Sequence, residues 1–205
     1  MWNGLFFQRS TLKELGLCVQ LGHPPGQFCP TREPACKDFV VIHTNGIHLV
    51  NVDYCRCNSL PHRTQLLRTA WWPATPIEPK TCATMEVLRH FQHLNLQGKL
   101  TGYSFYRSLE YETDNTGLEK PPVRYFIINL CPLTYTDGIQ NRLASFMLMV
   151  RQFRHTKMLK RGGRAYDPGG TMKTAPGSLA IPCRACPIPN INLPVGWENV
   201  PPARA

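Results

Sequence analysis

Two cysteines separated by one residue, Cys55 and Cys57, are the most informative feature of the sequence. They follow an apolar segment with a strand-like pattern, and Cys29 and His23 precede them along the chain. Thiolate sulfur and imidazole nitrogen are the ligands that tetrahedral zinc prefers. The pattern predicts a metal-binding module, with buried free thiols as the alternative. Two further histidines are close enough in sequence to contribute, namely His48 and His62.

The remaining cysteines fall into two groups. Cys183 and Cys186 have the C-x-x-C spacing of a zinc knuckle, so they predict a second metal site or two ligands that complete the first. Three others lie among apolar or helical residues and are expected to be small core side chains, namely Cys18, Cys82 and Cys131. The total of nine is odd, which argues against a disulfide framework.

Motifs for catalysis are missing from the sequence. There is no Gly-x-Ser-x-Gly, no phosphate-binding Walker loop and no His-Glu-x-x-His. The aspartates are scattered over expected turns, strands and loops, so none of them forms an evident pair that could hold two metal ions. We therefore expect no enzymatic activity and no small-molecule substrate.

The charge of the chain favours a polyanionic partner. Lys and Arg number 23 against 13 Asp and Glu, a formal net charge of +10. No acidic residue lies between Asp137 and Asp167. The basic residues of this stretch are expected either to form a solvated helix face or to contact DNA phosphates. The candidate nucleic-acid contacts are Arg151, Arg154, Lys157, Lys160, Arg161 and Arg164.

The start of the sequence lacks the apolar stretch of a signal peptide, and no segment approaches the length of a membrane span. A nuclear or cytoplasmic protein that is not secreted and has no membrane partner is expected. In such a reducing compartment, cysteines near histidines are better explained as metal ligands than as disulfides.

The expected secondary structure is a small α+β arrangement. Asn45-Gly46 between two apolar runs predicts a hairpin with a type I′ turn, which places Cys55 and Cys57 at the exit of a strand. Helical periodicity predicts helices from Thr81 to Gly98, over 101–113 and over 143–161. Residues 17–62 are short of large apolar side chains, so a metal is expected to couple to their folding.

These elements predict four regions. Residues 1–16 are a linker remnant, and 17–80 form the metal-binding β region, which zinc stabilises. Residues 81–161 are helical, and residues 162–205, rich in proline and glycine, form an extended tail that carries the C-x-x-C pair.

Most of the chain resembles the C-x-C-type cysteine-cluster domain associated with KDZ transposases, the Kyakuja, Dileera and Zisupton group that is abundant in fungal genomes. The matching pieces occur in one order from about residue 2 to 202. They are Leu15-Gly-Leu, Gln20-Leu-Gly-His-Pro24, Asp38-Phe-Val-Val, Thr44-Asn-Gly-Ile-His48, Cys55-x-Cys57, Pro61-His, Gln65-Leu-Leu-Arg68, Trp72-Pro-Ala-Thr75, Asp114-Asn-Thr-Gly117, Met149-Val-Arg-Gln152, Arg154-His, Met158-Leu-Lys-Arg-Gly-Gly-Arg164 and Asn192-Leu-Pro-x-Gly-Trp197.

The resemblance implies a zinc-chelating domain that lies N-terminal to a transposase core. It implies that Cys29, Cys55 and Cys57 are the metal ligands, with His48 or His62 as the fourth. The chain ends before the family's first catalytic acid, so the resemblance implies no strand transfer by these residues. About 17 residues, 125–141, interrupt the family pattern and are expected to be a translated intron or a β insertion.

The sequence thus predicts a zinc-binding, transposase-associated domain that binds DNA or a partner protein, such as a transposase core. One alternative is a protein-interaction module in which zinc only holds the fold. An active transposase with an acidic triad is a weaker alternative, because no constellation of acidic residues is evident.

Overall fold

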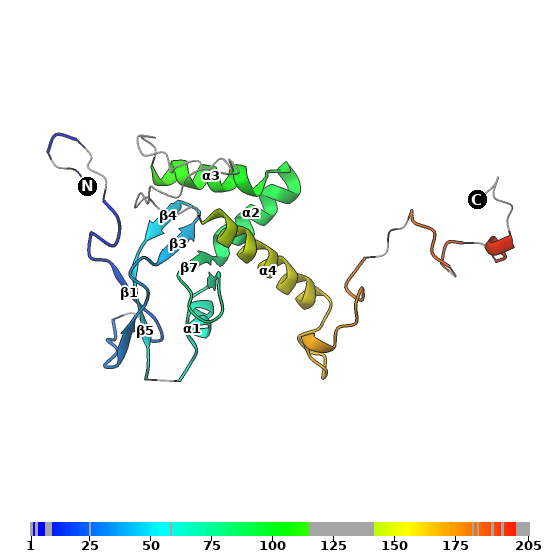
Figure 1. Cartoon of the computed structure of the whole chain (residues 1–205), viewed down its shortest axis with the longest axis horizontal. Coiled ribbons are helices and arrows are strands. Elements are labelled where there is room, and N and C mark those ends of the chain that lie inside the picture. Colours follow the sequence, from blue (N-terminus) through cyan, green and yellow to red (C-terminus); the bar gives the residue numbers. More distant parts are fainter. Residues whose placement is uncertain are drawn as a thin grey trace, which may run out of the picture. The chain divides into compact units, whose positions relative to one another are not determined.

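The computed structural model describes residues 2, 4–6, 10–24, 26–57, 59–114, 142–181, 183, 185–189, 191–193 and 195–199. The chain divides into two compact units, Met1–Arg154 and His155–Ala205. The first unit contains two small sheets and most of the helices (Figure 1). Among the described residues of the second unit, the regular structure beyond the end of α4 consists of two short 3-10 helices, Thr171–Lys173 and Trp197–Asn199.

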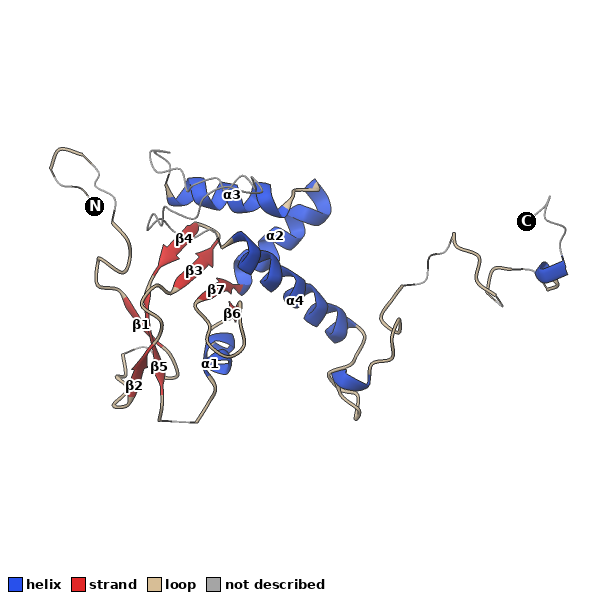
Figure 2. Cartoon of the chain, in the orientation of Figure 1, coloured by secondary structure: helices blue, strands red, loops and turns tan. Residues whose placement is uncertain are grey.

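Seven strands form the two sheets (Figure 2). The first sheet has the order β1-β5-β2, in which β5 (Asn51–Cys55) pairs in parallel with β1 (Cys18–Gln20) and antiparallel with β2 (Arg32–Pro34). The second has the order β4-β3-β7-β6. Its strands are β3 (Val40–His43), β4 (Gly46–Leu49), β6 (Trp71–Pro73) and β7 (Thr81–Thr84).

The predicted hairpin is present, but its turn differs from the expected type. His43 pairs with Gly46, so Thr44 and Asn45 are the two central residues of the turn. A type I′ turn needs positive φ at both central positions. Neither residue has a positive φ, whereas Gly46 adopts φ +135°. The positive φ is therefore found at Gly46, the first residue of β4, where glycine adopts it without steric cost.

Four α-helices follow or connect the strands: α1 (His62–Arg68), α2 (Met85–Gly98), α3 (Gly102–Thr113) and α4 (Leu143–Arg161). Thr84 and Thr101 cap α2 and α3, because their hydroxyls accept hydrogen bonds from main-chain N–H groups in the first turn. The prediction of a helix from Thr81 was wrong for its first four residues. They form β7, which pairs with β3 and β6 at the centre of the second sheet.

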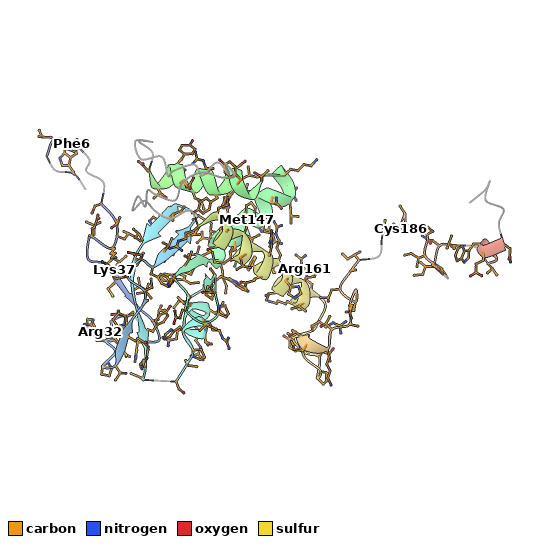
Figure 3. All side chains as sticks on the ribbon, viewed as in Figure 1. Phe6, Arg32, Lys37, Met147, Arg161 and Cys186 are labelled. Atoms are coloured by element: carbon orange, nitrogen blue, oxygen red, sulfur yellow. The ribbon has the colours of Figure 1, made fainter. Side chains whose placement is uncertain are left out.

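The larger hydrophobic core lies between the second sheet and the helices α2, α3 and α4. Ile42, Ala83, Phe91 and Phe146 are essentially completely buried in it. The first half of α4 contributes four buried side chains, namely Phe146, Met149, Val150 and Phe153. Met147, which is labelled on α4 in Figure 3, packs against the margin of the same core. Burial in this core explains why the first half of α4 is rich in apolar residues.

A second hydrophobic core lies by the first sheet. Its buried members are Leu21, Phe39, Val41, Val50, Val52, Tyr54, Leu66 and Cys82. The expectation that residues 17–62 lack large apolar side chains was therefore wrong. Several short segments each contribute one or two apolar side chains to this core, and Leu66 of α1 and Cys82 of β7 complete it.

The predicted α+β class is confirmed by the two sheets and four helices. The proposed insertion at 125–141, with Cys131, lies outside the described residues. No helix in the described ranges combines the length and the apolar character that a bilayer crossing requires. The four predicted regional boundaries stay predictions.

Candidate metal centre

Four metal-binding side chains converge beside the first sheet. The ligand atoms of His23, Cys29, Cys55 and Cys57 all lie within 4.8 Å of one another. The Sγ atoms of Cys29 and Cys57 are 3.4 Å apart, and Nε2 of His23 lies 3.1 Å from Sγ of Cys55. Among the described residues, this is the one group of three or more such donors that is arranged to hold a metal ion.

The central strand β5 explains this convergence. Beyond the end of β1, the N–H of Leu21 donates to the carbonyl of Asp53 at 2.8 Å, which holds the segment leading to His23 against β5. On the other side, the N–H of Arg56 donates to the carbonyl of Thr31 at 3.0 Å. Both hydrogen bonds continue strand pairing past the assigned strands. The segments that carry His23 and Cys29 are thereby brought to the end of β5, where Cys55 and Cys57 lie.

A glycine allows the main chain before His23 to pass close to Cys55. Gly22 adopts φ +82°, and a Cβ atom there would lie 2.5 Å from Cβ of Cys55. Such a distance is far inside van der Waals contact, and the positive φ is itself unfavourable for other residues. The residue before His23 must therefore be glycine for the histidine to reach the thiols.

The surroundings of Cys29 favour the deprotonated, thiolate form of its side chain. Burial of the Cys29 thiol opposes its ionisation. However, hydrogen bonds from the Cys57 thiol, the Thr31 main chain and the remaining donors of the cluster outweigh burial, and they lower the pKa of Cys29 to about 6. The N–H of Cys57 also donates to Sγ of Cys55 at 3.3 Å. Because metals bind the thiolate form, these interactions prepare the sulfurs for coordination.

The structure places neither His48 nor His62, the two predicted fourth ligands, in this group. His48 lies on β4 in the other sheet, where its Nε2 donates to Oδ1 of Asn45 at 2.9 Å. Burial lowers the pKa of His48, assisted by repulsion from His43. His62 begins α1 and stacks on Tyr54 with ring centroids 3.9 Å apart. Its Nε2 faces Oε2 of Glu33 at 3.3 Å, so its ring is occupied by other partners.

His23 joins the three thiols instead. It belongs to the Gln20-Leu-Gly-His-Pro24 piece, and its position six residues before Cys29 made it a candidate by proximity in sequence. What the sequence did not reveal is that the β1–β5 pairing brings His23 next to Cys55.

The other thiols have varied surroundings. Cys82 is completely buried and burial raises its pKa, as expected for a core residue. Cys18 is exposed on β1, so its predicted core position was wrong. Cys183 and Cys186 are exposed in the second unit, and the N–H of Cys186 donates to the carbonyl of Cys183 at 3.3 Å. In the described residues no third metal-binding side chain gathers with this pair.

The basic residues between Arg151 and Arg164, which are the predicted contacts to DNA, fall into two groups. Some of them have partners within the protein, and others are exposed. Nη2 of Arg154 donates to Oδ1 of Asn95 at 2.7 Å, and its guanidinium lies 5.6 Å from the centre of the Phe91 ring. Arg164 forms an ion pair with Asp167 at 3.1 Å. Lys157 is half-buried, whereas Arg151, Lys160 and Arg161 are exposed. Figure 3 labels Arg161 at the end of α4.

Three thiols and one imidazole form a donor set that suits a tetrahedral, borderline-soft metal ion. Ligands at ordinary zinc distances lie roughly 3.3–3.8 Å from one another in a tetrahedron. The separation of 3.4 Å between Sγ of Cys29 and Sγ of Cys57 falls in that range, whereas the separation of 3.1 Å between His23 and Cys55 is slightly shorter. Since all four ligand atoms lie within 4.8 Å of one another, side-chain adjustments would bring them to the spacing of a tetrahedral site. All four ligands come from the protein, which is typical of structural sites and not of catalytic sites with an open position.

Comparison with known proteins gave one family. The model of the CxC2-like cysteine cluster associated with KDZ transposases matches residues 12–117. This range contains all four members of the candidate site and ends at the close of the Asp114-Asn-Thr-Gly117 piece. Searches of curated proteins and of solved structures found no match. The chain belongs to the family of CxC2-like cysteine clusters associated with KDZ transposases.

Proposed function

We propose that this chain is a zinc-binding module associated with a transposase, that it binds DNA through its basic residues and that it performs no catalysis itself. The observation that carries the proposal is the convergence of His23, Cys29, Cys55 and Cys57. A closed set of four protein ligands gives zinc a structural role, because no position is left for a substrate or water.

Zinc is favoured over other ions by the donor atoms. Hard cations such as magnesium and calcium prefer oxygen ligands, and this group has none. Three thiolates with one imidazole suit zinc, which has no redox chemistry. The ligands must lose their protons on binding, and the lowered pKa of Cys29 reduces that cost near neutral pH.

Metal content tests this part of the proposal. The intact chain, purified without added metal and examined by native mass spectrometry and elemental analysis, is expected to carry zinc. A variant with Cys55→Ser and Cys57→Ser should lose the metal, whereas Cys18→Ser, at an exposed thiol outside the group, should keep it. A parent chain that binds no zinc, even after reduction and reconstitution, would disprove the zinc proposal.

DNA binding is supported by the net charge of +10 and by the exposed basic residues Arg151, Lys160 and Arg161. These side chains suit contacts with phosphates, which provide affinity without reading the base sequence. Gel-shift titrations of duplexes at two salt concentrations test this, because release of counterions makes such binding fall steeply with salt. Several unrelated duplex sequences should bind with similar affinity. A DNA partner would favour the nuclear location over the cytoplasmic one.

The second candidate is a protein-interaction module with a purely structural zinc, whose partner is the transposase core or another protein. Two observations favour it. Arg154 and Arg164 have internal partners, which reduces the number of cations that are available to phosphates. In addition, an open pocket of about 580 Å³ lies next to Cys55 and His62, with the largely exposed Ile77 at its wall. Absence of DNA binding at low salt would favour this candidate.

A further inference from the structure

Two glutamine side chains hold the main chain of two of the four metal ligands. Gln65 is 2 % exposed and belongs to α1, whereas Gln20 is the last residue of β1. Neither has its carboxamide among the four ligand atoms. Each one uses both its oxygen and its nitrogen on the backbone near a ligand cysteine.

Gln65 acts on Cys55. Its Oε1 accepts a hydrogen bond from the N–H of Cys55 at 2.9 Å, and its Nε2 donates to the carbonyl of the same residue at 2.8 Å. The second proton of Nε2 is donated to the carbonyl of Leu60 at 3.1 Å. A single buried carboxamide thereby fixes both polar groups of the Cys55 main chain and anchors the loop that follows the C-x-C pair.

Gln20 acts on Cys29 in a similar way. Its Oε1 accepts from the N–H of Cys29 at 3.0 Å, and its Nε2 donates to the carbonyl of Gln27 at 2.9 Å. The loop between His23 and Cys29 is thus held near its end by the strand that precedes it. A carboxamide can accept and donate at the same time, whereas a carboxylate of similar size lacks the donor and an apolar side chain lacks both.

We propose that Gln65 and Gln20 are positioning residues of the metal centre, which set its affinity by fixing Cys55 and Cys29 before metal arrives. This inference rests on the proposed metal-binding function. Ordering the ligands in advance lowers the entropy that metal binding must otherwise remove. Residues of this kind, which orient ligands without touching the metal, typically change metal affinity by about 10–100-fold when they are mutated.

The test uses methionine, which has a similar length and volume to glutamine but cannot form these hydrogen bonds. Gln65→Met and Gln20→Met are compared with the parent in a zinc competition titration against a chromophoric chelator. The matched control is Gln92→Met in α2, a half-buried glutamine outside the metal centre. Absorption spectra of the cobalt-loaded proteins report whether three thiolates and an imidazole still bind.

We expect the zinc dissociation constant to rise about 10–100-fold in Gln65→Met and in Gln20→Met, with the cobalt spectrum preserved and Gln92→Met unchanged. A purely structural role would lower the melting temperature without moving the dissociation constant of the folded protein. If Gln65→Met does not fold, Gln20→Met at the half-buried strand end still decides the question. Parent-like affinity in the folded variants would overturn the inference, whereas a parent that binds no metal would instead disprove the proposed function.

Discussion

The indole Nε1 of Trp72 donates a hydrogen bond to Oε1 of Gln152 at 3.0 Å, although 80 residues separate the two side chains. Trp72 lies on β6, and its ring also meets Phe153 edge to face, with ring centroids 5.8 Å apart. The family match ends at residue 117, so α4 lies beyond it. A helix outside the matched range thus completes the core of the matched domain.

Removing a large buried side chain from α4 should destabilise the whole first unit. Phe146 is completely buried and packs near Phe91, Phe105 and Tyr106. Phe146→Ala is expected to lower the free energy of unfolding by about 3–5 kcal/mol. Leu148→Ala, on the same helix at a side chain 42 % exposed, should change it by less than about 1 kcal/mol. Urea denaturation measures both, and equal effects would mean that α4 does not contribute to the core as described.

Deleting residues 125–141 should leave the stability of the chain unchanged or raise it. The reason is that this segment interrupts the family pattern in sequence. The measurement is thermal and chemical unfolding of the deletion variant beside the parent. A loss of more than about 2 kcal/mol, the scale of a real core contribution, would show that the segment is an integral part of the fold.

Loss of the metal should loosen the loops around the cluster more than the sheets. In Cys55→Ser with Cys57→Ser, or after chelation, amide hydrogen exchange should accelerate in residues 22–32 and 55–60, since the metal would otherwise tie them together. The helices α2 and α3 should keep their protection, because they pack in the other core. Unchanged exchange throughout the first unit would argue that these thiols are small buried side chains and not ligands.

Substitutions in the basic segment should separate DNA-binding residues from residues that stabilise the fold. Replacing Arg151, Lys160 and Arg161 by Ala should weaken binding equally for all duplexes and reduce the salt slope by about 0.9 for each phosphate that is no longer neutralised. Arg154→Ala should mainly reduce stability, because Asn95 and Phe91 would then lack their partner. Gel shifts and thermal melts test the two expectations. A salt slope unaltered in the triple variant would favour the protein-interaction module.

Acid should weaken the fold partly through Glu33. Its hydrogen bond with Arg56, opposed by burial and supported by His62, lowers the pKa of Glu33 from 4.5 to about 2. The unfolded chain therefore takes up a proton at higher pH than the folded chain does. The resulting stabilisation is complete above pH 4.5 and is lost as the pH falls toward 2. Glu33→Gln should flatten the dependence of unfolding free energy on pH across this window.

The matched variant for this prediction is Arg56→Ala, which removes the strongest cause of the low pKa and leaves the carboxylate in place. In this variant the pH at which stability is lost should rise toward 4.5, the ordinary pKa of a glutamate. Both variants are studied without metal, so that protonation of the ligands does not add to the profile. An acid profile in Glu33→Gln identical to that of the parent would refute the assignment.

Local patterns in the sequence were enough to predict several features. The periodicity of apolar residues located the helix at 143–161, and Thr101 together with Thr113 bounded the helix before it. The C-x-C spacing singled out Cys55 and Cys57, and the order of short motifs identified the family. Such signals are local, because capping, periodicity and ligand type depend on neighbours along the chain.

Tertiary structure alone decided which donors meet. His48 lies nearer to Cys55 in sequence than His23 does, but it points to Asn45 from another sheet. His62 is also nearer than His23, and it stacks on Tyr54 beside Glu33. His23 reaches the thiols because parallel pairing of β1 with β5 joins segments more than 30 residues apart, and Gly22 leaves room for Cys55. Strand register and close backbone approach depend on interactions between distant residues, and no pattern of neighbouring side chains specifies them.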